Sequence, residues 1–190
     1  MPDLKQKKNN QITTDFFITD ADHTTLDEKP AIRLYGRTED GKSAIVLTTD
    51  FEPYFYIIPK DDPKDTQKKI TELKLKDAQA QPINIKSTTI QKKTVASKEI
   101  PVIKIIAHTP KDIPKLKDAI KHLDFVEDKR EYDIPFARRY LFDKDITPMS
   151  WLKVKGTEIK TKTRYSCDTT IMADVIEKKE TGQDFPKLNI

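Results

Sequence analysis

The sequence contains little cysteine and glycine, and each shortage excludes a kind of site. The single cysteine, Cys167, allows neither an internal disulfide nor a thiolate zinc cluster and is typical of a reducing compartment. No two of the four glycines lie within four residues of each other, which excludes a dinucleotide fingerprint and a phosphate-binding loop. The three histidines are widely separated, and no metal site is expected.

Long hydrophobic runs are also missing. No stretch approaches the ~20 apolar residues of a membrane-spanning helix, and the opening residues MPDLKQKKNNQ lack the apolar segment of a secretory signal. With 190 residues, of which 36% are hydrophobic and 35% charged, the chain has material for a modest core in one or two domains. We therefore expect a soluble, cytoplasmic protein.

The net charge of +4 is unevenly distributed. Residues 53–142 carry 19 basic and 13 acidic side chains, whereas residues 1–52 are slightly acidic. An excess of positive charge in the middle of the chain favours an anionic partner for that part. A solvated lysine-rich surface explains the same excess equally well.

The first quarter of the chain is rich in branched and aromatic residues and predicts a strand meander. Strands are expected over 15–19, 31–35 and 43–48. The Asp40-Gly41 pair between the last two predicts a hairpin turn. Near the C-terminus, strands are expected over 151–154, 158–163 and 169–176, with Gly156 near a turn.

The middle of the chain alternates strand-like and helix-like windows. Asp62 followed by Pro63 predicts a helix N-terminus, and Asp112 is expected to cap a second helix with a helical apolar period. Strands are expected over 54–58, 83–86, 102–107 and 125–127, with the polar stretch 87–99 separating the second from the third. The resulting order is βαββαβ, the split unit of ferredoxin-like domains. Pro135 is expected to open a further short helix.

We therefore predict an α+β fold, in which a mainly antiparallel, barrel-like part is built around the βαββαβ unit. The expected organisation is a disordered lead-in at 1–11, a barrel-like part from 12–52 and 143–176, the βαββαβ unit with a short helix at 53–142, and a linker at 177–190.

Three patterns are open to a chemical interpretation. Asp50-Phe51-Glu52 has the Asp-x-Glu form of two-metal nucleases, but its place before Pro53 suits ordinary turn chemistry better. The βαββαβ unit also fits an RNA-recognition domain, although its third strand has no aromatic residue for base stacking. Arg138 and Arg139 either donate to phosphates or are surface arginines of a helix, and spacing leaves both open.

Several segments resemble, in the same order, the N-terminal domain of archaeal family B DNA polymerases. The most specific is EYDIPFARRYL at 131–141. The others are KPAIRLYGR at 29–37, FEPYFYI at 51–57, HTPKDIPKLKDAI at 108–120 and FDKDITPMSWLKV at 142–154. FPKLNI at 185–190 resembles the lead-in to the family's exonuclease domain, so the chain is expected to end just before that domain.

The resemblance implies that the parent chain is a DNA-directed DNA polymerase with 3′-5′ exonuclease activity. Mg²⁺ and a sliding clamp are implied for that full enzyme, and this part would contact its exonuclease and palm domains. The palm motifs with their metal-binding aspartates are absent from the 190 residues. The fragment itself is therefore expected to catalyse nothing and to hold no cofactor or metal.

The resemblance also implies binding of single-stranded template ahead of the active site and sensing of uracil and hypoxanthine. Matched position by position, the family's pocket falls on Pro53, Tyr54, Pro110, Ile113, Ile134 and Phe136. Arg139, with Arg138 beside it, takes the phosphate-contacting position. Two positions depart from the family, since His23 replaces an aromatic residue of the pocket and Ile113 replaces the commonest residue, valine.

Two alternatives to base sensing remain. These departures favour a structural scaffold that docks against the neighbouring domains with a weakened pocket. The βαββαβ unit alone favours RNA binding, which the missing third-strand aromatics oppose.

Overall fold

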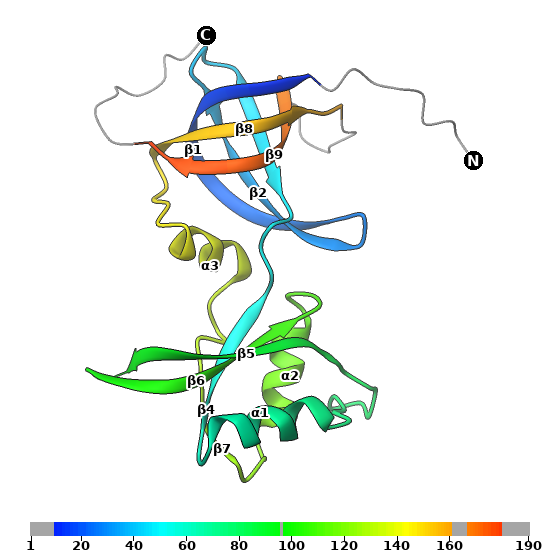
Figure 1. The fold of residues 1–190 in the computed structure, drawn as a ribbon. Helices are drawn as coiled ribbons and strands as arrows, with labels where there is room; N and C mark the ends of the chain where they lie inside the picture. Colours follow the sequence, from blue (N-terminus) through cyan, green and yellow to red (C-terminus); the bar gives the residue numbers. More distant parts are fainter. Residues whose placement is uncertain (1–9, 96, 161–166, 180–190) are drawn as a thin grey trace. The chain divides into compact units, whose positions relative to one another are not determined.

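The computed structural model describes residues 10–95, 97–160 and 167–179. Within these ranges the chain forms three helices and nine strands, arranged as one mixed sheet and one antiparallel sheet (Figure 1), which confirms the predicted α+β class. The chain divides into two compact units, one of residues 1–24, 31–50 and 137–190 and the other of residues 25–30 and 51–136. The boundaries expected from the sequence remain a prediction, and residues 1–9 and 180–190 lie outside the described residues.

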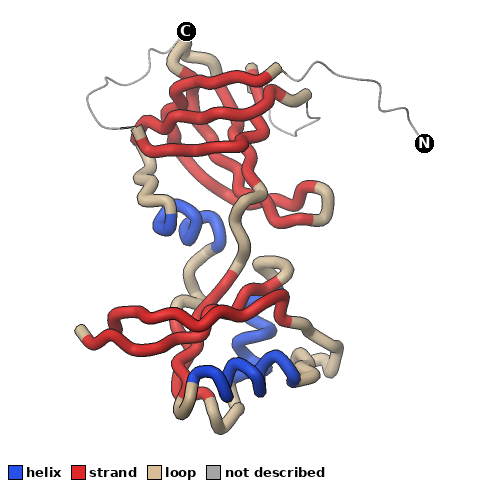
Figure 2. Tube along the Cα trace, viewed as in Figure 1, coloured by secondary structure: helices blue, strands red, loops and turns tan. Residues whose placement is uncertain are grey.

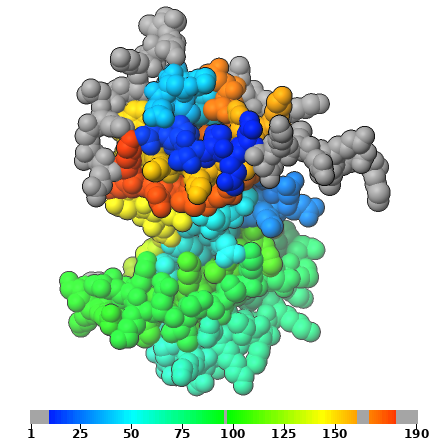
Figure 3. All heavy atoms as spheres, turned by 45° about the horizontal axis from the view of Figure 1, so that its top comes forward, coloured from blue at the N-terminus to red at the C-terminus, as the bar shows by residue number. Residues whose placement is uncertain are grey.

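The first unit contains a closed barrel of five strands. They are β1 (Gln11–Leu26), β2 (Lys29–Thr38), β3 (Ser43–Thr48), β8 (Ser150–Glu158) and β9 (Thr169–Lys178). Their order is β1-β2-β3-β9-β8, with β3 and β9 parallel and β8 antiparallel to both β1 and β9. The dark blue atoms of β1 lie against those of β8 in the space-filling view (Figure 3). This order matches the five-stranded Greek-key barrel of OB-folds.

Buried apolar side chains from several strands fill the barrel. Phe16, Ile18 and Leu34 are fully buried, and Leu152 and Val154 from β8 are buried with them. The branched and aromatic residues of segments 15–19 and 31–35 predicted strands there, and the structure confirms those strands within longer ones. The predicted β2–β3 hairpin is also confirmed, because the Gly41 N–H donates to the Thr38 carbonyl at 2.9 Å.

Two expectations for the last strands are wrong. Gly156 lies inside β8 at a shift in register and not near a turn, where an added Cβ would come within 2.1 Å of the Met172 carbonyl oxygen. A glycine there marks a close backbone approach. The strand expected over 158–163 is also incorrect where it can be seen, because β8 ends at Glu158; residues 161–163 lie outside the described residues.

The second unit contains the predicted βαββαβ order. Its elements are β4 (Tyr54–Pro59), α1 (Pro63–Glu72), β5 (Ile85–Val95), β6 (Lys98–Ala107), α2 (Asp112–Ile120) and β7 (Val126–Arg130). The antiparallel sheet has the order β5-β6-β4-β7, with both helices, blue in Figure 2, packed through one core. That core joins Phe55 and Ile57 of β4 to Leu116 of α2. The ferredoxin-like arrangement is therefore confirmed.

Of the two predicted helix N-caps, Asp62 and Asp112, the structure confirms the first and not the second. The Asp62 carboxylate accepts from the backbone N–H groups of Lys64 and Asp65 at 2.9 and 3.0 Å, which confirms the predicted cap of α1. Asp112 does not cap α2 as expected. Its carboxylate accepts instead from the Thr109 N–H and hydroxyl at 3.0 and 2.9 Å, because it is already inside the first turn.

The largest error concerns β5. The stretch 87–99 looked like a polar connection, but most of it forms β5 and the start of β6. These strands have 11 and 10 residues, against 6 in β4 and 5 in β7, so their hairpin extends beyond the other two (Figure 1). A hairpin arm that extends past its helices has no buried face to impose an apolar alternation. The predicted helix after Pro135 is confirmed as α3 (Phe136–Asp143).

Candidate nucleic-acid interface

The pocket predicted from the sequence begins at the entry to β4. Pro53 is buried, and its carbonyl accepts from the Ala107 N–H at 2.9 Å at the end of β6. Tyr54 follows as the first residue of β4, opposite Ile106, and is 6% exposed. The backbone of both predicted residues is therefore fixed by the sheet.

Aromatic rings connect this segment to the residues that precede α3. The Phe51 ring lies 6.1 Å from the Tyr54 ring, edge to face, and stacks on the Phe136 ring at 5.4 Å and 26°. Aromatic pairs with this spacing stabilise beyond their buried area. The structure thus brings together two of the predicted pocket residues, Tyr54 and Phe136, through Phe51, which the sequence did not single out.

Pro110 and Ile113 belong to the start of α2. The Ile113 N–H donates to the Pro110 carbonyl at 3.3 Å, and Pro110 itself is half-buried. The Ile113 side chain is 8% exposed and belongs to the core cluster that also contains Phe55 and Ala107. Ile134, which is half-buried, lies in the connection before Phe136. Ile113 therefore contributes to the core of the second unit, and its place in the recess remains a prediction.

The remaining predicted residues belong to the barrel unit. His23 is exposed on β1. It belongs to the first unit, whereas the other predicted pocket residues belong to the second. Arg138 and Arg139 lie in α3, where Arg138 is exposed and Arg139 is 5% exposed. Of the two predicted phosphate contacts, Arg138 is the more accessible one.

The sheet face opposite the helices carries aromatic rings covered by lysines. Tyr54 and Tyr56 alternate along β4 with Phe55 and Ile57 of the helix-side core, so the two tyrosines point to the other face. Their rings lie 5.3 Å apart. The Lys104 Nζ is 3.7 Å from the centroid of the Tyr54 ring, and the Lys93 Nζ is 4.0 Å from that of Tyr56. Such contacts are cation–π interactions.

This face was not predicted from the sequence, because base stacking was expected to need aromatic residues on the third strand of the unit. The third strand, β6, indeed has none, but the first strand supplies Tyr54 and Tyr56. The signal was available in YFYII at 54–58, since a period of two puts both tyrosines on one side. The rings are only 6% and 4% exposed, so a base would have to displace a lysine to stack on them.

The Asp-x-Glu pair at residues 50 and 52 is divided between two sets of partners. Asp50 accepts from the Thr48 hydroxyl at 2.6 Å and from Lys144, whereas Glu52 pairs with Lys86 at 2.5 Å. Among the described residues no three His, Cys, Asp or Glu side chains lie close enough to hold a metal ion. In the same part of the chain, none of the helices combines the length and the apolar character that a membrane span requires.

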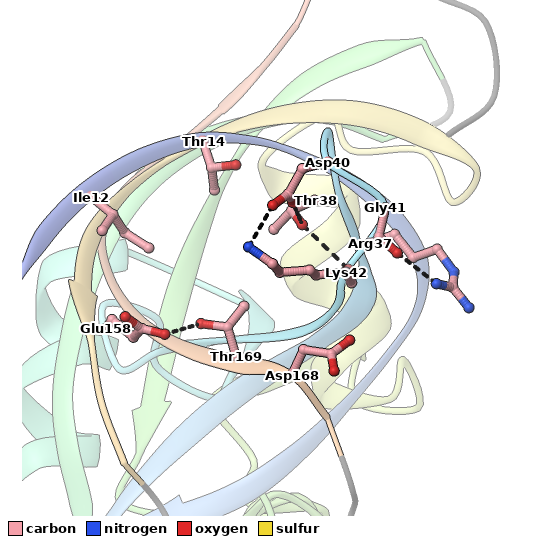
Figure 4. A pocket seen from close by; sticks show the side chains of 10 residues that line it. All are labelled: Ile12, Thr14, Arg37, Thr38, Asp40, Gly41, Lys42, Glu158, Asp168 and Thr169. Atoms are coloured by element: carbon pink, nitrogen blue, oxygen red, sulfur yellow. Dashed lines mark hydrogen bonds and ion pairs between the residues drawn. The ribbon is translucent and has the colours of Figure 1, made fainter. Parts of the chain in front are cut away.

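The barrel unit has a cavity at one end of its barrel. This cavity of about 670 Å³ is lined by residues of β1, of the β2–β3 turn and near the ends of β8 and β9, and the Lys42 side chain extends into it whereas Arg37 points away (Figure 4). Lys42 pairs with Asp40 at 2.6 Å, which lowers the pKa of Asp40 and raises that of Lys42. Hydrogen bonds from Ser43 lower the pKa of Asp168. Several charged groups of this cavity pair with one another or with the backbone, since Arg37 donates to the Gly41 carbonyl and Asp168 accepts from the Ser43 N–H.

Comparison with known proteins agrees with this architecture. The chain is 38% identical over 148 residues to a DNA polymerase of Thermococcus sp. (strain GE8), covering 76% of this chain and 8% of that protein. It is 37% identical over 148 residues to a DNA polymerase of Thermococcus gorgonarius, covering 76% of this chain and 18% of that one. The chain therefore spans less than a fifth of these relatives.

A solved structure gives the same fold. The family B DNA polymerase of Pyrobaculum calidifontis matches 91% of this chain and 21% of its own with a TM-score of 0.72 at 21% identity. The sequence profile of the DNA polymerase family B exonuclease domain matches residues 127–190. This match begins upstream of the boundary expected at Ile190 and includes β8 and β9, which close the barrel with β1.

The two units define an α+β module in which a five-stranded barrel is combined with a ferredoxin-like sheet. The chain is homologous to the N-terminal region of archaeal family B DNA polymerases.

Proposed function

We propose that the chain is the N-terminal module of a DNA-directed DNA polymerase with 3′-5′ exonuclease activity, and that it binds single-stranded template and senses uracil. Mg²⁺ and a sliding clamp belong to the parent enzyme in this proposal, and the module itself performs no chemistry. The observation that supports it best is the stack of Phe136 on Phe51, which joins two of the segments expected to form the pocket.

Hydrogen bonding would distinguish uracil from cytosine. A base must leave the strand to be inspected, and unstacking costs less in single-stranded DNA than in a duplex. Backbone groups near Tyr54 and Ile134 would bond the O2, N3–H and O4 edge of uracil, whereas cytosine presents the inverse pattern at N3 and C4. Leaving those groups unpaired costs about 1 to 3 kcal/mol.

Sterics would distinguish uracil from thymine. The two bases share the same hydrogen-bonding edge, so only the 5-methyl group can exclude thymine. Forcing an additional methyl group into a closely packed recess costs about 1 to 3 kcal/mol. Proline and branched walls, such as Pro53 and Ile113, suit this role because they have few conformations in which to make room. Hypoxanthine would be captured in the same recess.

The test is binding of the 190-residue chain to single strands that differ at one base. Strands with uracil, thymine or cytosine at that position are compared at matched salt, because phosphate contacts dominate affinity. The proposal expects the uracil strand to bind more tightly than both others. Equal affinity for all three would contradict base sensing.

A scaffold role is the second candidate. It is favoured by the burial of Arg139 and by the two departures from the family's pocket, at His23 and Ile113. A chain that shows no salt-dependent DNA binding, in a parent enzyme that copies past uracil without stalling, would support the scaffold.

A further inference from the structure

The β5–β6 hairpin bends over the open face of its own sheet. Thr89 of β5 pairs with Lys104, and Lys93 lies four residues further along, about 13 Å away in an extended strand. Nevertheless the Lys93 Nζ lies 4.0 Å from the centroid of the Tyr56 ring. It also lies 2.9 Å from the Glu131 carboxylate, just after β7.

This bend encloses a cleft of about 280 Å³. Its lining includes Tyr56 and Val102 on the sheet, Lys93 and Val95 on the hairpin, and Arg130 and Glu131 at the end of β7. We call it the arm cleft. It lies entirely within the second unit and contains none of the residues predicted for the uracil pocket.

Basic groups flank Tyr56 on both sides. Tyr56 pairs with Lys104 of β6 and with Arg130 of β7, so the three residues form one row across the sheet. Neighbouring strands lie about 4.8 Å apart, which places both cationic residues beside the same ring. The Arg130 side chain is 52% exposed and pairs with Asp128 at 2.7 Å, a surface contact that a stronger anion can replace.

Glu131 holds Lys93 in position over the ring. Its backbone has a φ of 61°, a left-handed conformation that is uncommon for a residue with a side chain. The Lys93 and Glu131 side chains are 33% and 32% exposed, so their ion pair is weak enough to open. A bound anion would compete with the Glu131 carboxylate for the Lys93 ammonium.

We propose that the arm cleft binds a phosphodiester group of single-stranded DNA, with Lys93 and Arg130 as donors and Glu131 as the competing internal anion. The inference rests on the proposed function in one respect, that the strand is the template. Val95 and Val102 give the cleft an apolar wall, which suits a deoxyribose beside the phosphate. The basic excess of this part of the sequence thereby acquires a specific location.

The test measures binding of the 190-residue chain to a thymine-only strand of about 12 nucleotides at several salt concentrations. Each phosphate contact to a single strand contributes about 0.7 to the slope of log K against log salt, or about fourfold in affinity between 1 M and 0.15 M salt. Lys93→Gln and Arg130→Gln are each expected to weaken binding by about fourfold and to lower the slope by about 0.7. Glu131→Gln is expected to tighten binding, because the competing charge is lost while the fold is kept.

Lys68→Gln is the matched control. Lys68 is exposed on α1, which packs against the opposite face of the sheet, and its loss should change affinity by less than about twofold. A Glu131→Gln variant that binds no more tightly than the wild type would overturn the proposal. An effect of Lys68→Gln equal to that of Arg130→Gln would overturn it too.

Two further outcomes separate the possibilities. RNA of the same length bound as tightly as DNA would overturn the assignment to DNA. If the arm-cleft variants change affinity as expected while uracil and thymine strands bind equally, the proposed base sensing fails and the arm cleft stands. If the arm-cleft variants have no effect while the uracil strand is preferred, the arm cleft fails as a DNA site and the proposed base sensing stands.

Discussion

The ring of Phe136 stacks on the ring of Phe51, with centroids 5.4 Å apart and planes inclined by 26°. Phe51 also contacts Tyr54, so this one side chain joins the segment that enters β4 to the segment that enters α3. If the base pocket lies between these segments, its shape depends on a residue outside the predicted set. Phe51 is therefore a positioning residue in this account.

Replacing Phe51 tests that dependence. Phe51→Ala should destabilise the fold by about 3 kcal/mol, because a ring that is 9% exposed leaves a cavity, and it should reduce the preference for uracil over thymine. Phe142→Ala is the control, since that ring is 63% exposed and its loss should cost less than about 0.5 kcal/mol. Urea unfolding and strand binding measure both effects. If a folded Phe51→Ala protein keeps the same preference for uracil over thymine, Phe51 does not position the pocket.

Ile113 tests the steric exclusion of thymine. Ile113→Val should lower the ratio of uracil to thymine affinity, because a recess enlarged by one methylene admits the 5-methyl group more easily. The accompanying loss of stability should be about 1 kcal/mol. Glutamine would be a poor probe here, since its amide would be buried in the core cluster.

The control for Ile113 is Ile120→Val in the same cluster, where the side chain is fully buried. It should cost a similar free energy of unfolding and leave the affinity ratio unchanged. A parallel fall in the ratio for both variants would show that general loosening of α2, and not the size of the recess, controls discrimination.

Gly156 tests the close approach of β8 to β9. Gly156→Ala should lower the free energy of unfolding by about 1 to 3 kcal/mol, because the added Cβ would lie 2.1 Å from the Met172 carbonyl oxygen. Lys155→Ala, on the exposed neighbouring residue, should change stability by less than about 0.5 kcal/mol. Urea unfolding distinguishes the two. Equal stabilities would mean that the strands separate easily at the register shift.

Asp168 predicts a dependence of stability on pH. Its carboxylate accepts from the Ser43 N–H and hydroxyl at 2.8 and 2.7 Å, and these bonds hold its pKa below the ordinary value of 3.8. A lowered pKa in the folded state gives stability above the unfolded pKa, which is lost as the pH falls through the folded one. Asp168→Asn should therefore be less stable than the wild type at neutral pH, and the difference should shrink as the pH falls below 3.8 and through the lowered pKa of Asp168. Asp174→Asn, on an exposed residue of β9, is the control and should change stability at neutral pH by less than about 0.5 kcal/mol. If Asp168→Asn remains less stable than the wild type in acid, the loss of stability comes from changed packing and not from the lost carboxylate charge.

Local chemistry predicted much of the fold. Asp62-Pro63 predicted the start of α1, Asp40-Gly41 predicted the β2–β3 turn, and the branched and aromatic residues at 15–19 and 31–35 predicted two of the barrel strands. The polar arm of β5 was missed because both its faces lack the apolar pattern by which strands are recognised. Gly156 was wrongly expected near a turn, because the group that requires a glycine there, the Met172 carbonyl, is distant in the sequence.

The candidate site was predictable only in part. The segments of Tyr54 and Phe136 could be identified by family resemblance, but Phe51, which joins them, could not. The position of Lys93 over Tyr56 depends on a bent hairpin, and no local pattern at Lys93 indicates that its ammonium reaches this ring.

The most direct measurement is the ratio of dissociation constants for two single strands that differ by one methyl group, thymine against uracil at a single position, at the same salt concentration. The account predicts that the uracil strand binds about 5- to 150-fold more tightly, which corresponds to the 1 to 3 kcal/mol expected for overpacking a rigid recess. A ratio of one, measured with a chain that still binds both strands, would contradict it.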